Sequence, residues 1–491
     1  MKKRADGHLK IKKIKKPKPE KLESIREEDI ILRLKSDLDK EEARDISIKE
    51  GSYASISQGV GHSYISPFAI ALGANNAQIG ILSSLPGIIS PLSQLRGFRF
   101  MEKRSRKEIV REHVFLEAMM WLLILILAIL GMNNILKIEL PFLLIILYSL
   151  LIYIGGLSFP SWFSWMGDIV SEKSRARYFS KRNRITGTVA LISMLIASFF
   201  LDYLKTKGLT LAGFAILFLI ANLARLRSCN LFKKQHEPEL KLKKGYYYPL
   251  KHFITSLPKS NLGKFVIFNL LLNFARFIAA PFFAVYMLRD LGLSYTWFTA
   301  ITITGTIFTL LSLTLWGKFT DKYGSRTTLK IGSSLIPLIP ILWLFSKNPI
   351  YLMLVPGLIG GLGWAAFNIS STSFIYDSTT REKRAMFIAY HNIVTGLGLI
   401  LGGLLGSLLA QKLTIGFMNI ILFIFLLSGI LRALVCLIMI PQIKEVRKVK
   451  KTKKLVRAIL KEVKTIHQHQ GVHHEPIYFK HSYPITIGVK K

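Results

Sequence analysis

Two basic side chains, His62 and Arg276, are set inside hydrophobic stretches of the sequence, GHSYISPF and LLNFARFIAAPFF. Matching the prolines that follow them, Pro67 and Pro281, puts the two at equivalent positions of the two stretches. A charged side chain at the centre of a membrane helix costs about 2.5 to 3.5 kcal/mol, so such a residue usually has a function. The pair predicts a site for an anionic group between two helices near mid-membrane.

Each of these residues also has a structural interpretation. Arg276 could instead pair with carbonyl groups at a helix end or with a carboxylate of another span. His62 could be a hydrogen-bonded interior histidine, a binding residue or a proton relay. Other polar residues, some at helical spacing from these two, could line the same cavity or hydrogen-bond between helices. These further candidate substrate-binding residues are Gln58, Ser66, Asn269, Asn273, Trp364 and Asn368.

Acidic residues are absent from the middle of the hydrophobic stretches. We expect Glu117 to lie within about two turns of the cytoplasmic end of its helix, where the side chain can snorkel to water. Asp202 is expected at the outer end of its helix. A proton-coupled carrier usually has a buried carboxylate. Its absence favours exchange or facilitated diffusion of an anion, with His62 as the remaining candidate for a proton site.

The elements that position these residues are hydrophobic helices. The chain has 491 residues, 51% of them hydrophobic, in runs long enough to cross a bilayer, which takes about 20 residues per helix. The runs lack the alternation of a membrane β-strand. The sequence therefore predicts an all-α polytopic membrane protein with about twelve transmembrane helices. The expected spans are 53–73, 77–98, 112–132, 140–166, 178–202, 209–229, 263–288, 296–317, 327–346, 349–376, 384–410 and 414–440.

The basic excess of the chain, with a formal charge of +38, lies mostly in alternate loops and in the tail from Lys444 onward. Such a pattern predicts an integral membrane protein, of the plasma membrane, with both termini in the cytoplasm. It favours contact of the tail with anionic membrane lipid over nucleic-acid binding, because no nucleic-acid-binding motif accompanies it. Cys229 and Cys436 are expected to be unpaired.

The two halves of the sequence resemble each other. The segment DIVSEKSRARYFSKRNRITG, which begins at Asp168, matches DSTTREKRAMFIAYHNIVTG, which begins at Asp377, at several positions without a gap. Arg225 likewise aligns with Arg432. Two similarly folded bundles with a seam between them follow from this repeat. The predicted parts are a charged N-terminal segment, a first six-helix bundle, a linker, a second six-helix bundle and a basic C-terminal tail, at residues 1–50, 51–229, 230–262, 263–441 and 442–491.

The loop after the eighth span, GKFTDKYGSR, resembles the Gly-x-x-x-Asp-Arg/Lys-x-Gly-x-Arg/Lys signature of the major facilitator superfamily. The first half has a decayed copy, EKRSRK, which lacks both glycines. The resemblance implies two pseudo-symmetric six-helix bundles that carry a solute by alternating access. In this family the acid caps a neighbouring helix and pairs with basic residues to hold one conformation. The residues that would form such conformational gates are Glu102, Arg106, Asp168, Arg175, Gly317, Asp321, Gly324, Arg326, Asp377 and Arg384.

Paired basic residues at the positions of His62 and Arg276 resemble the organic-phosphate exchanger branch of the superfamily, where the pair binds the anionic group of the substrate. His62 departs from that pattern, because a neutral imidazole carries no charge. The resemblance therefore implies secondary active or facilitative transport of a small solute, with an organic anion as the candidate. The alternative is a protein of the same fold that carries no solute and acts as a sensor or scaffold at the membrane.

Enzymatic motifs are missing from the sequence. It contains no nucleotide-binding loop, redox centre or nucleophile with its base, so we expect neither an enzyme nor a cofactor. Four histidines of the tail could bind a transition metal, but a solvated tail without fixed geometry is the interpretation we adopt, and no metal site is predicted. They are His467, His469, His473 and His474. We expect a monomer.

Overall fold

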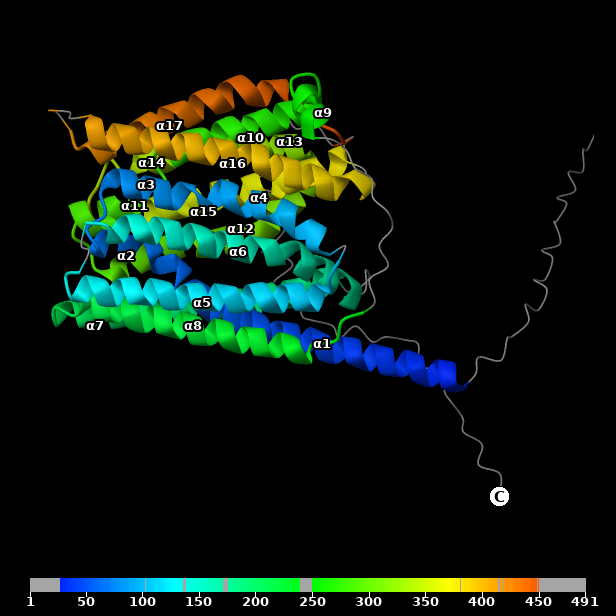
Figure 1. Cartoon of the computed structure of the whole chain (residues 1–491). Coiled ribbons are helices and arrows are strands. Elements are labelled where there is room, and N and C mark those ends of the chain that lie inside the picture. The colour runs from blue at the N-terminus through cyan, green and yellow to red at the C-terminus, as the bar shows by residue number, and fades with distance from the viewer. Residues whose placement is uncertain are drawn as a thin grey trace, which may run out of the picture.

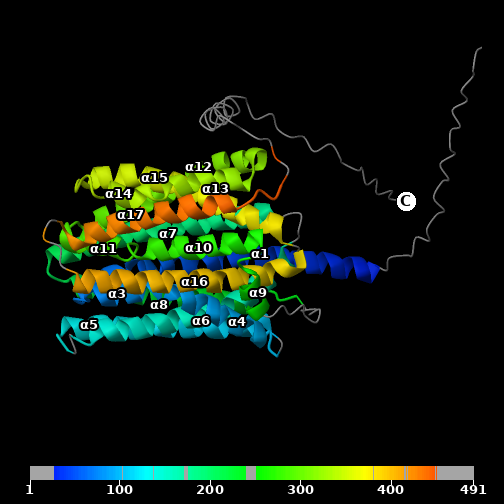
Figure 2. The ribbon, with the colours of Figure 1, turned by 90° about the horizontal axis from the view of Figure 1, so that it is seen from above.

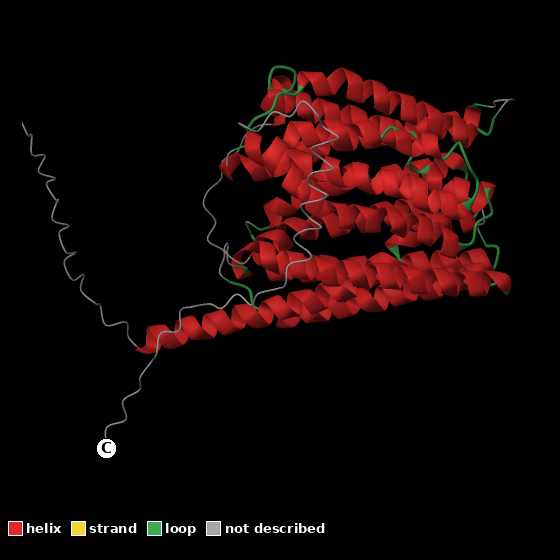
Figure 3. Cartoon of the chain, turned by 180° about the vertical axis from the view of Figure 1, so that it is seen from behind, coloured by secondary structure: helices red, strands yellow, loops and turns green. Residues whose placement is uncertain are grey.

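The computed structural model contains only helices, turns and loops in the part of the chain that it describes (Figures 1 and 3). That part comprises residues 27–101, 103–135, 138–170, 175–238, 250–379, 381–413, 416, 418–447 and 449, without the side chains of residues 27–37, 98, 175–177, 250–252 and 381–386. The predictions for Glu102 and for the four tail histidines therefore lie outside the described residues, as do those for the side chains of Arg175 and Arg384.

Eight α-helices and one 3-10 turn build the first half. They are α1 (Glu27–Val60), η1 (His62–Tyr64), α2 (Ile65–Ala71), α3 (Asn76–Ser84), α4 (Pro86–Phe100), α5 (Arg106–Met132), α6 (Leu140–Ile169), α7 (Arg175–Thr206) and α8 (Thr210–Lys234). Polar side chains start several of them: Asn75 caps α3 and Ser105 caps α5 by accepting a backbone N–H, which satisfies one of the donors left free at a helix start.

The second half repeats this order after the short helix α9 (Leu250–Ser256). Its helices are α10 (Asn261–Phe277), α11 (Phe282–Val285), the π-helix η2 (Tyr286–Asp290), α12 (Tyr295–Tyr323), α13 (Ser325–Leu335), α14 (Leu338–Leu342), α15 (Pro349–Ser378), α16 (Arg381–Lys412), α17 (Ile420–Met439) and the 3-10 turn η3 (Ile440–Gln442). In Figure 1, α1, α5 and α8 lie at the bottom of the bundle, and α10, α16 and α17 lie at the top.

Nine helical segments among the described residues are long and apolar enough to cross a membrane. The other three predicted spans fall on helix pairs that are interrupted: α1 and α2 around Gly61, α3 and α4 at Pro86, and α13 and α14 at Pro337. A proline within a helical stretch removes a backbone donor and bends the chain. The prediction of about twelve spans in two halves thus agrees with the helices observed.

The halves touch along a seam that is closely packed at one end. α16 lies beside α3 and α4 (Figure 2), and a Cβ added to Gly396 of α16 would be 2.2 Å from the carbonyl oxygen of Gly87. Asp202, at the end of α7, accepts from the backbone N–H groups of Tyr295 and Thr296 at the start of α12, at 2.7 and 2.8 Å. These hydrogen bonds lie at the end of the bundle away from the long segment that joins the halves.

Three predicted boundaries need correction. α1 is continuous across residue 50, and Ala43, Ser47 and Glu50 are buried, so the first bundle begins well before residue 51. α8 runs to Lys234, past the expected end at residue 229. Residues after 441 also pack on the second half, since the backbone of Lys444 exchanges two hydrogen bonds with the side chain of Asn261. The sequence did not predict these contacts, because the segments contain charged residues that usually lie in water. A charged residue is buried only where it has a partner, and such a partner can lie far away in the sequence.

Gly396→Val is expected to lower the stability of the protein, because the added methyl groups meet the backbone of α4. Overpacking of this kind costs about 1 to 3 kcal/mol. The matched control is Gly187→Val: Gly187 aligns with Gly396 in the repeat, but a Cβ there meets nothing within 4 Å. Thermal unfolding in detergent should show a lower Tm for the first variant only. Equal Tm values for both would contradict the packed seam.

Candidate solute-binding site

A cavity of about 570 Å³ opens among α10, α15 and α16 of the second half. Five of the predicted substrate-binding residues line it: Asn269, Asn273, Arg276, Trp364 and Asn368. α10 supplies the first three at intervals of three or four residues, which places them on one helical face. α15 supplies the other two, also four residues apart. The spacing along two helices therefore produces one polar wall.

Arg276 is the cation of this wall. The centre of its guanidinium group lies 4.4 Å from the centroid of the Trp364 ring, a cation–π contact. Within the described part of the chain, no carboxylate oxygen lies within 4.0 Å of Arg276, so the alternative of a structural ion pair finds no support there. The cavity thus contains a positive charge that no carboxylate of the described residues neutralises.

Arg432 lies directly behind Arg276. It is 2% exposed and donates to the backbone carbonyl oxygens of Ile336 and Arg276, at 3.4 and 3.3 Å. Its Nε has no hydrogen-bond partner among the described residues. Two guanidinium groups therefore lie close together in the second half without a carboxylate partner in the described chain.

The cavity wall contains further polar atoms without partners. Nε2 of His391 and Oγ of Ser371 are buried and make no hydrogen bond within the described chain. Buried polar groups are nearly always hydrogen-bonded, so such atoms indicate a place for a ligand or for water. The amide nitrogens of Asn269 and Asn273 donate to carbonyl groups one turn earlier in α10. Their amide oxygens remain available to accept from a hydroxyl or N–H group.

Sequence reasoning missed His391 and Ser371. Both lie in the cytoplasm-proximal parts of the predicted spans, where polar residues are common and carry no signal of burial. The one hint was the position of His391 beside Asn392, which is in register with Asn183 in the repeat. Only packing against α10, where the His391 ring stacks on Phe265 at 6.0 Å, brings it to the cavity.

His62 does not join this cavity in the structure. Its Nε2 is 3.9 Å from Glu117, its Nδ1 is 3.3 Å from the hydroxyl of Tyr148, and its ring meets the edge of Trp121 at 5.0 Å. Gln58 and Ser66 are also absent from the lining of the cavity described above. The structure therefore brings together the predicted binding residues of the second half, and leaves those of the first half in a separate environment.

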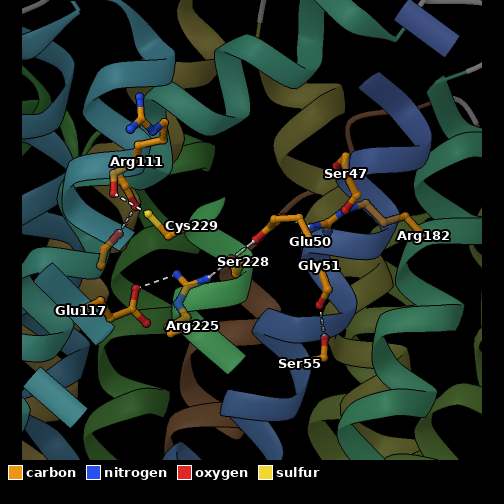
Figure 4. Close-up of polar contacts among 12 residues, drawn as sticks. Ser47, Glu50, Gly51, Ser55, Arg111, Glu117, Arg182, Arg225, Ser228 and Cys229 are labelled. Atoms are coloured by element: carbon orange, nitrogen blue, oxygen red, sulfur yellow. Dashed lines mark hydrogen bonds and ion pairs between the residues drawn. The ribbon is translucent and has the colours of Figure 1, made fainter. Parts of the chain in front are cut away.

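The sequence predicted that the Glu117 side chain snorkels to water, and this prediction is wrong. Glu117 is buried, with 6% of its surface exposed. It lies near the middle of α5, and accepts from Arg225 of α8 at 2.6 Å. Arg225 also lies 3.7 Å from Glu50 of α1, and Glu50 lies 3.5 Å from Arg182 of α7 (Figure 4). Two carboxylates and two guanidinium groups thus alternate in space. Their four formal charges sum to zero.

The two halves differ at one point of this arrangement. Arg225 and Arg432 are equivalent in the repeat, and so are Glu102 and Asp321. Counting equally far along the chain from Glu102 and from Asp321 makes Glu117 of the first half equivalent to Ile336 of the second. Arg225 pairs with the Glu117 carboxylate, whereas Arg432 meets the backbone carbonyl groups of Ile336 and Arg276. The four buried charges of the first half balance one another, whereas Arg276 and Arg432 of the second half have no carboxylate partner among the described residues.

The predicted gate of the first half has a partner that the sequence did not suggest. Arg106 is fully buried and bonds to Asp168 at the end of α6. Its Nε also lies 3.3 Å from Glu237, whose carboxylate accepts the backbone N–H groups of Arg106 and Lys107 at 2.8 and 3.2 Å. Glu237 follows α8 and thereby caps α5, where a negative charge interacts favourably with the helix dipole.

The second half has an equivalent helix cap, formed by a glutamate that follows its last helix. Glu445, which follows α17 and η3, accepts from the backbone N–H of Arg326 at 2.9 Å and from the hydroxyl of Ser325 at 3.1 Å. Gly324 begins this turn with a φ of 91°, which favours glycine. Asp377 pairs with Arg447 at 2.7 Å.

Asp321, the acidic residue of the predicted gate in the second half, does not cap a helix or pair with a basic residue in the described chain. Its side chain is exposed, and no hydrogen bond or ion pair of Asp321 occurs within the described chain. Gly317, at the start of the same signature, has open space around its Cα, since an added Cβ meets nothing within 4 Å. The gate roles of both residues remain predictions.

Comparison with known proteins agrees with this fold. Residues 265–478 match the sequence model of the Major Facilitator Superfamily. No curated protein matches the chain. A point mutant of the nucleoside transporter NupG is a similar solved structure, with a TM-score of 0.63 and 17% identity over 81% of this chain and 100% of that one.

Two bacterial structures are similar to a comparable extent. A bacterial homologue of the iron transporter ferroportin, in its inward-facing state, has a TM-score of 0.63 and 14% identity, covering 82% of this chain and 99% of its own. A bacterial homologue of the human lysosomal transporter Spinster, inward-facing and unoccupied, has a TM-score of 0.58 and 14% identity, covering 86% and 98%. The second half of the chain therefore matches the sequence model of this superfamily, and the chain is an integral membrane protein with the fold of these solved transporters.

Glu117→Gln is expected to destabilise the protein strongly, because it leaves the buried Arg225 without its closest counter-charge. Breaking a buried ion pair from one side costs about 3 to 5 kcal/mol. The matched control is Glu112→Gln on the same helix: Glu112 pairs with Arg104 at 2.6 Å, but both side chains are 45% exposed, and exposed pairs contribute about 1 kcal/mol or less. Denaturant unfolding in detergent measures both. A loss in the control as large as in Glu117→Gln would refute the charge network.

Proposed function

We propose that this transporter carries small organic anions by alternating access and binds the anionic group at Arg276. The supporting observation is the position of that guanidinium group in a cavity with no carboxylate within 4.0 Å in the described chain. The amide oxygens of Asn269 and Asn273 would accept from hydroxyl or N–H groups on the rest of the solute. We propose no catalytic role for these residues.

Electrostatics favours an anion over other solutes. Taking a cation out of water is costly, and a counter-charge in a medium of low dielectric recovers much of that cost. An anionic solute would supply this counter-charge to Arg276, with Arg432 behind it adding to the positive potential. A cationic solute would be repelled, and a neutral solute would leave the charge of Arg276 uncompensated. The first half, with its four balanced charges, adds no net preference.

The conformation supports alternating access. The hydrogen bonds of Asp202 hold the halves together at the end away from the middle linker. The basic loops lie at the other end of the bundle, which the positive-inside rule assigns to the cytoplasm. On this orientation both termini are cytoplasmic and the structure faces inward, the state named for two of the similar structures. We further propose a plasma-membrane monomer with lipid around it, and no nucleic-acid partner.

The contacts of Glu237 and Glu445 join segments within one half. We propose that they hold each half as one body at its cytoplasmic end, together with the pairs Arg106–Asp168 and Arg447–Asp377. This role differs from the predicted conformational gate, because it stabilises each half and does not select one conformation.

Arg276→Gln is expected to reduce anion uptake roughly tenfold or more, because removing one partner of a desolvated charge pair costs about 2 to 5 kcal/mol. Arg276→Lys should retain part of the activity, since it keeps the charge. The measurement is uptake of radiolabelled lactate, succinate, phosphate, glucose and lysine into proteoliposomes. The control is Arg227→Gln, which removes an exposed arginine of α8.

Different outcomes separate the remaining possibilities. Glucose or lysine uptake that does not change in Arg276→Gln would refute the anion site while leaving solute transport intact. Movement of no solute at all, with correctly inserted protein, would favour the alternative of a sensor or scaffold.

A further inference from the structure

A second cavity adjoins the Arg276 cavity in the same half. It measures about 390 Å³ and lies mainly between α12 and α15. Trp364 and Asn368 line both cavities, so they form a common wall. A ligand that contacts Arg276 is therefore within one side chain of the second cavity, which the proposed anion site does not use.

The lining of this second cavity is apolar. No charged side chain contributes to it; Phe283, Met287, Ile339 and Trp343 form one part of the wall and Leu352 and Pro356 another. Two of its polar side chains are satisfied within their own helix: the hydroxyl groups of Thr302 and Thr309 donate to carbonyl oxygens one turn earlier in α12, at 2.8 and 2.9 Å. An apolar group would lose little by entering this space, and would gain by leaving water.

Glycines shape the same space. Gly305 on α12 and Gly360 on α15 both line it. A Cβ added to Gly305 would meet nothing within 4 Å, and one added to Gly360 would only reach ordinary contact with Ile339 at 3.6 Å. These glycines are therefore not required by close packing between helices. They leave room on the cavity side.

We propose that the solute is an amphipathic organic anion whose charged group binds Arg276 and whose apolar body occupies the second cavity. The proposal rests on the proposed function and narrows its substrate class. Trp364 joins the two subsites, because its ring carries the Arg276 guanidinium at 4.4 Å and also lines the apolar cavity. A small inorganic anion would use only the first subsite. A neutral apolar solute would use only the second.

Alkanesulfonates test this arrangement, because they stay ionised and do not cross the bilayer as neutral acids. Uptake of ethane-, butane- and hexanesulfonate into proteoliposomes gives a KM for each chain length. Transfer of methylene groups into an apolar site predicts a KM that falls about fourfold for each added CH₂. Arg276→Gln should raise KM for all three compounds and keep the ratio between them, since it removes only the charged subsite.

Filling the second cavity should remove the dependence on chain length. Gly305→Val and, on the facing helix, Gly360→Val should each reduce the ratio of KM for ethanesulfonate to KM for hexanesulfonate at least tenfold. Because the two variants lie on different helices, the test still works if one of them misfolds. Thermal unfolding shows whether each variant is folded. The matched control is Leu311→Phe, which adds bulk to α12 at a side chain that is 72% exposed; it should keep the wild-type ratio.

Each result decides a different point. Arg276-dependent uptake of ethanesulfonate with equal KM values along the series would overturn the apolar subsite while the anion site stands. A chain-length dependence that persists in both glycine variants would place the apolar contact elsewhere and refute this cavity. Absence of uptake for every sulfonate by the wild-type protein would overturn this proposal and count against the anion site as well.

Discussion

The cost of leaving a charge unpaired inside the membrane is the constraint on which this structure depends. In the first half, Glu117 and Glu50 balance Arg225 and Arg182 within a network that spans α1, α5, α7 and α8. Such a network can hold a bundle together, because each group is stabilised only while its partners stay in place. In the second half, Arg276 and Arg432 lack this compensation in the described chain. One half of the repeat pairs its buried charges with one another, and the other has a buried arginine, Arg276, in the wall of a cavity.

A single exchange within the repeat accounts for much of this difference. Where the first half has the Glu117 carboxylate, the equivalent position of the second half is Ile336, whose backbone carbonyl is all that it offers Arg432. The Ile336 side chain is fully buried and belongs to the hydrophobic core of the second half.

The sequence predicted the helices, and a shared helical face for three of the proposed binding residues, for a physical reason. Hydrophobic length and helical spacing are local properties, so the spans and the shared face of Asn269, Asn273 and Arg276 could be derived from neighbouring residues. The pairing of Glu117 with Arg225 could not, because their 108-residue separation is closed only by packing of α5 on α8. The same holds for Glu237 and Glu445, which follow the last helix of each half and return to cap an earlier one. The placement of His62 opposite Arg276 also relied on symmetry alone, and the structure gives His62 partners within its own half.

The distribution of polar contacts explains how two such halves can move as bodies. Within each half, charged groups are buried or cap helix ends, and breaking them exposes an unpaired charge. Across the seam, the contacts include the hydrogen bonds of Asp202, those of Arg289 with Asn76 and Ala74, and close approaches of glycine. The hydroxyl groups of Tyr64 and Thr299 also form a buried hydrogen bond between the halves, at 2.9 Å. The groups that bond to Asp202 and Arg289 lie near the bundle end, where water can replace the lost partners at a small net cost. Because the interior of each half is expensive to disrupt and the seam is not, relative motion concentrates at the seam, which is what a site that opens to alternate sides of a membrane requires.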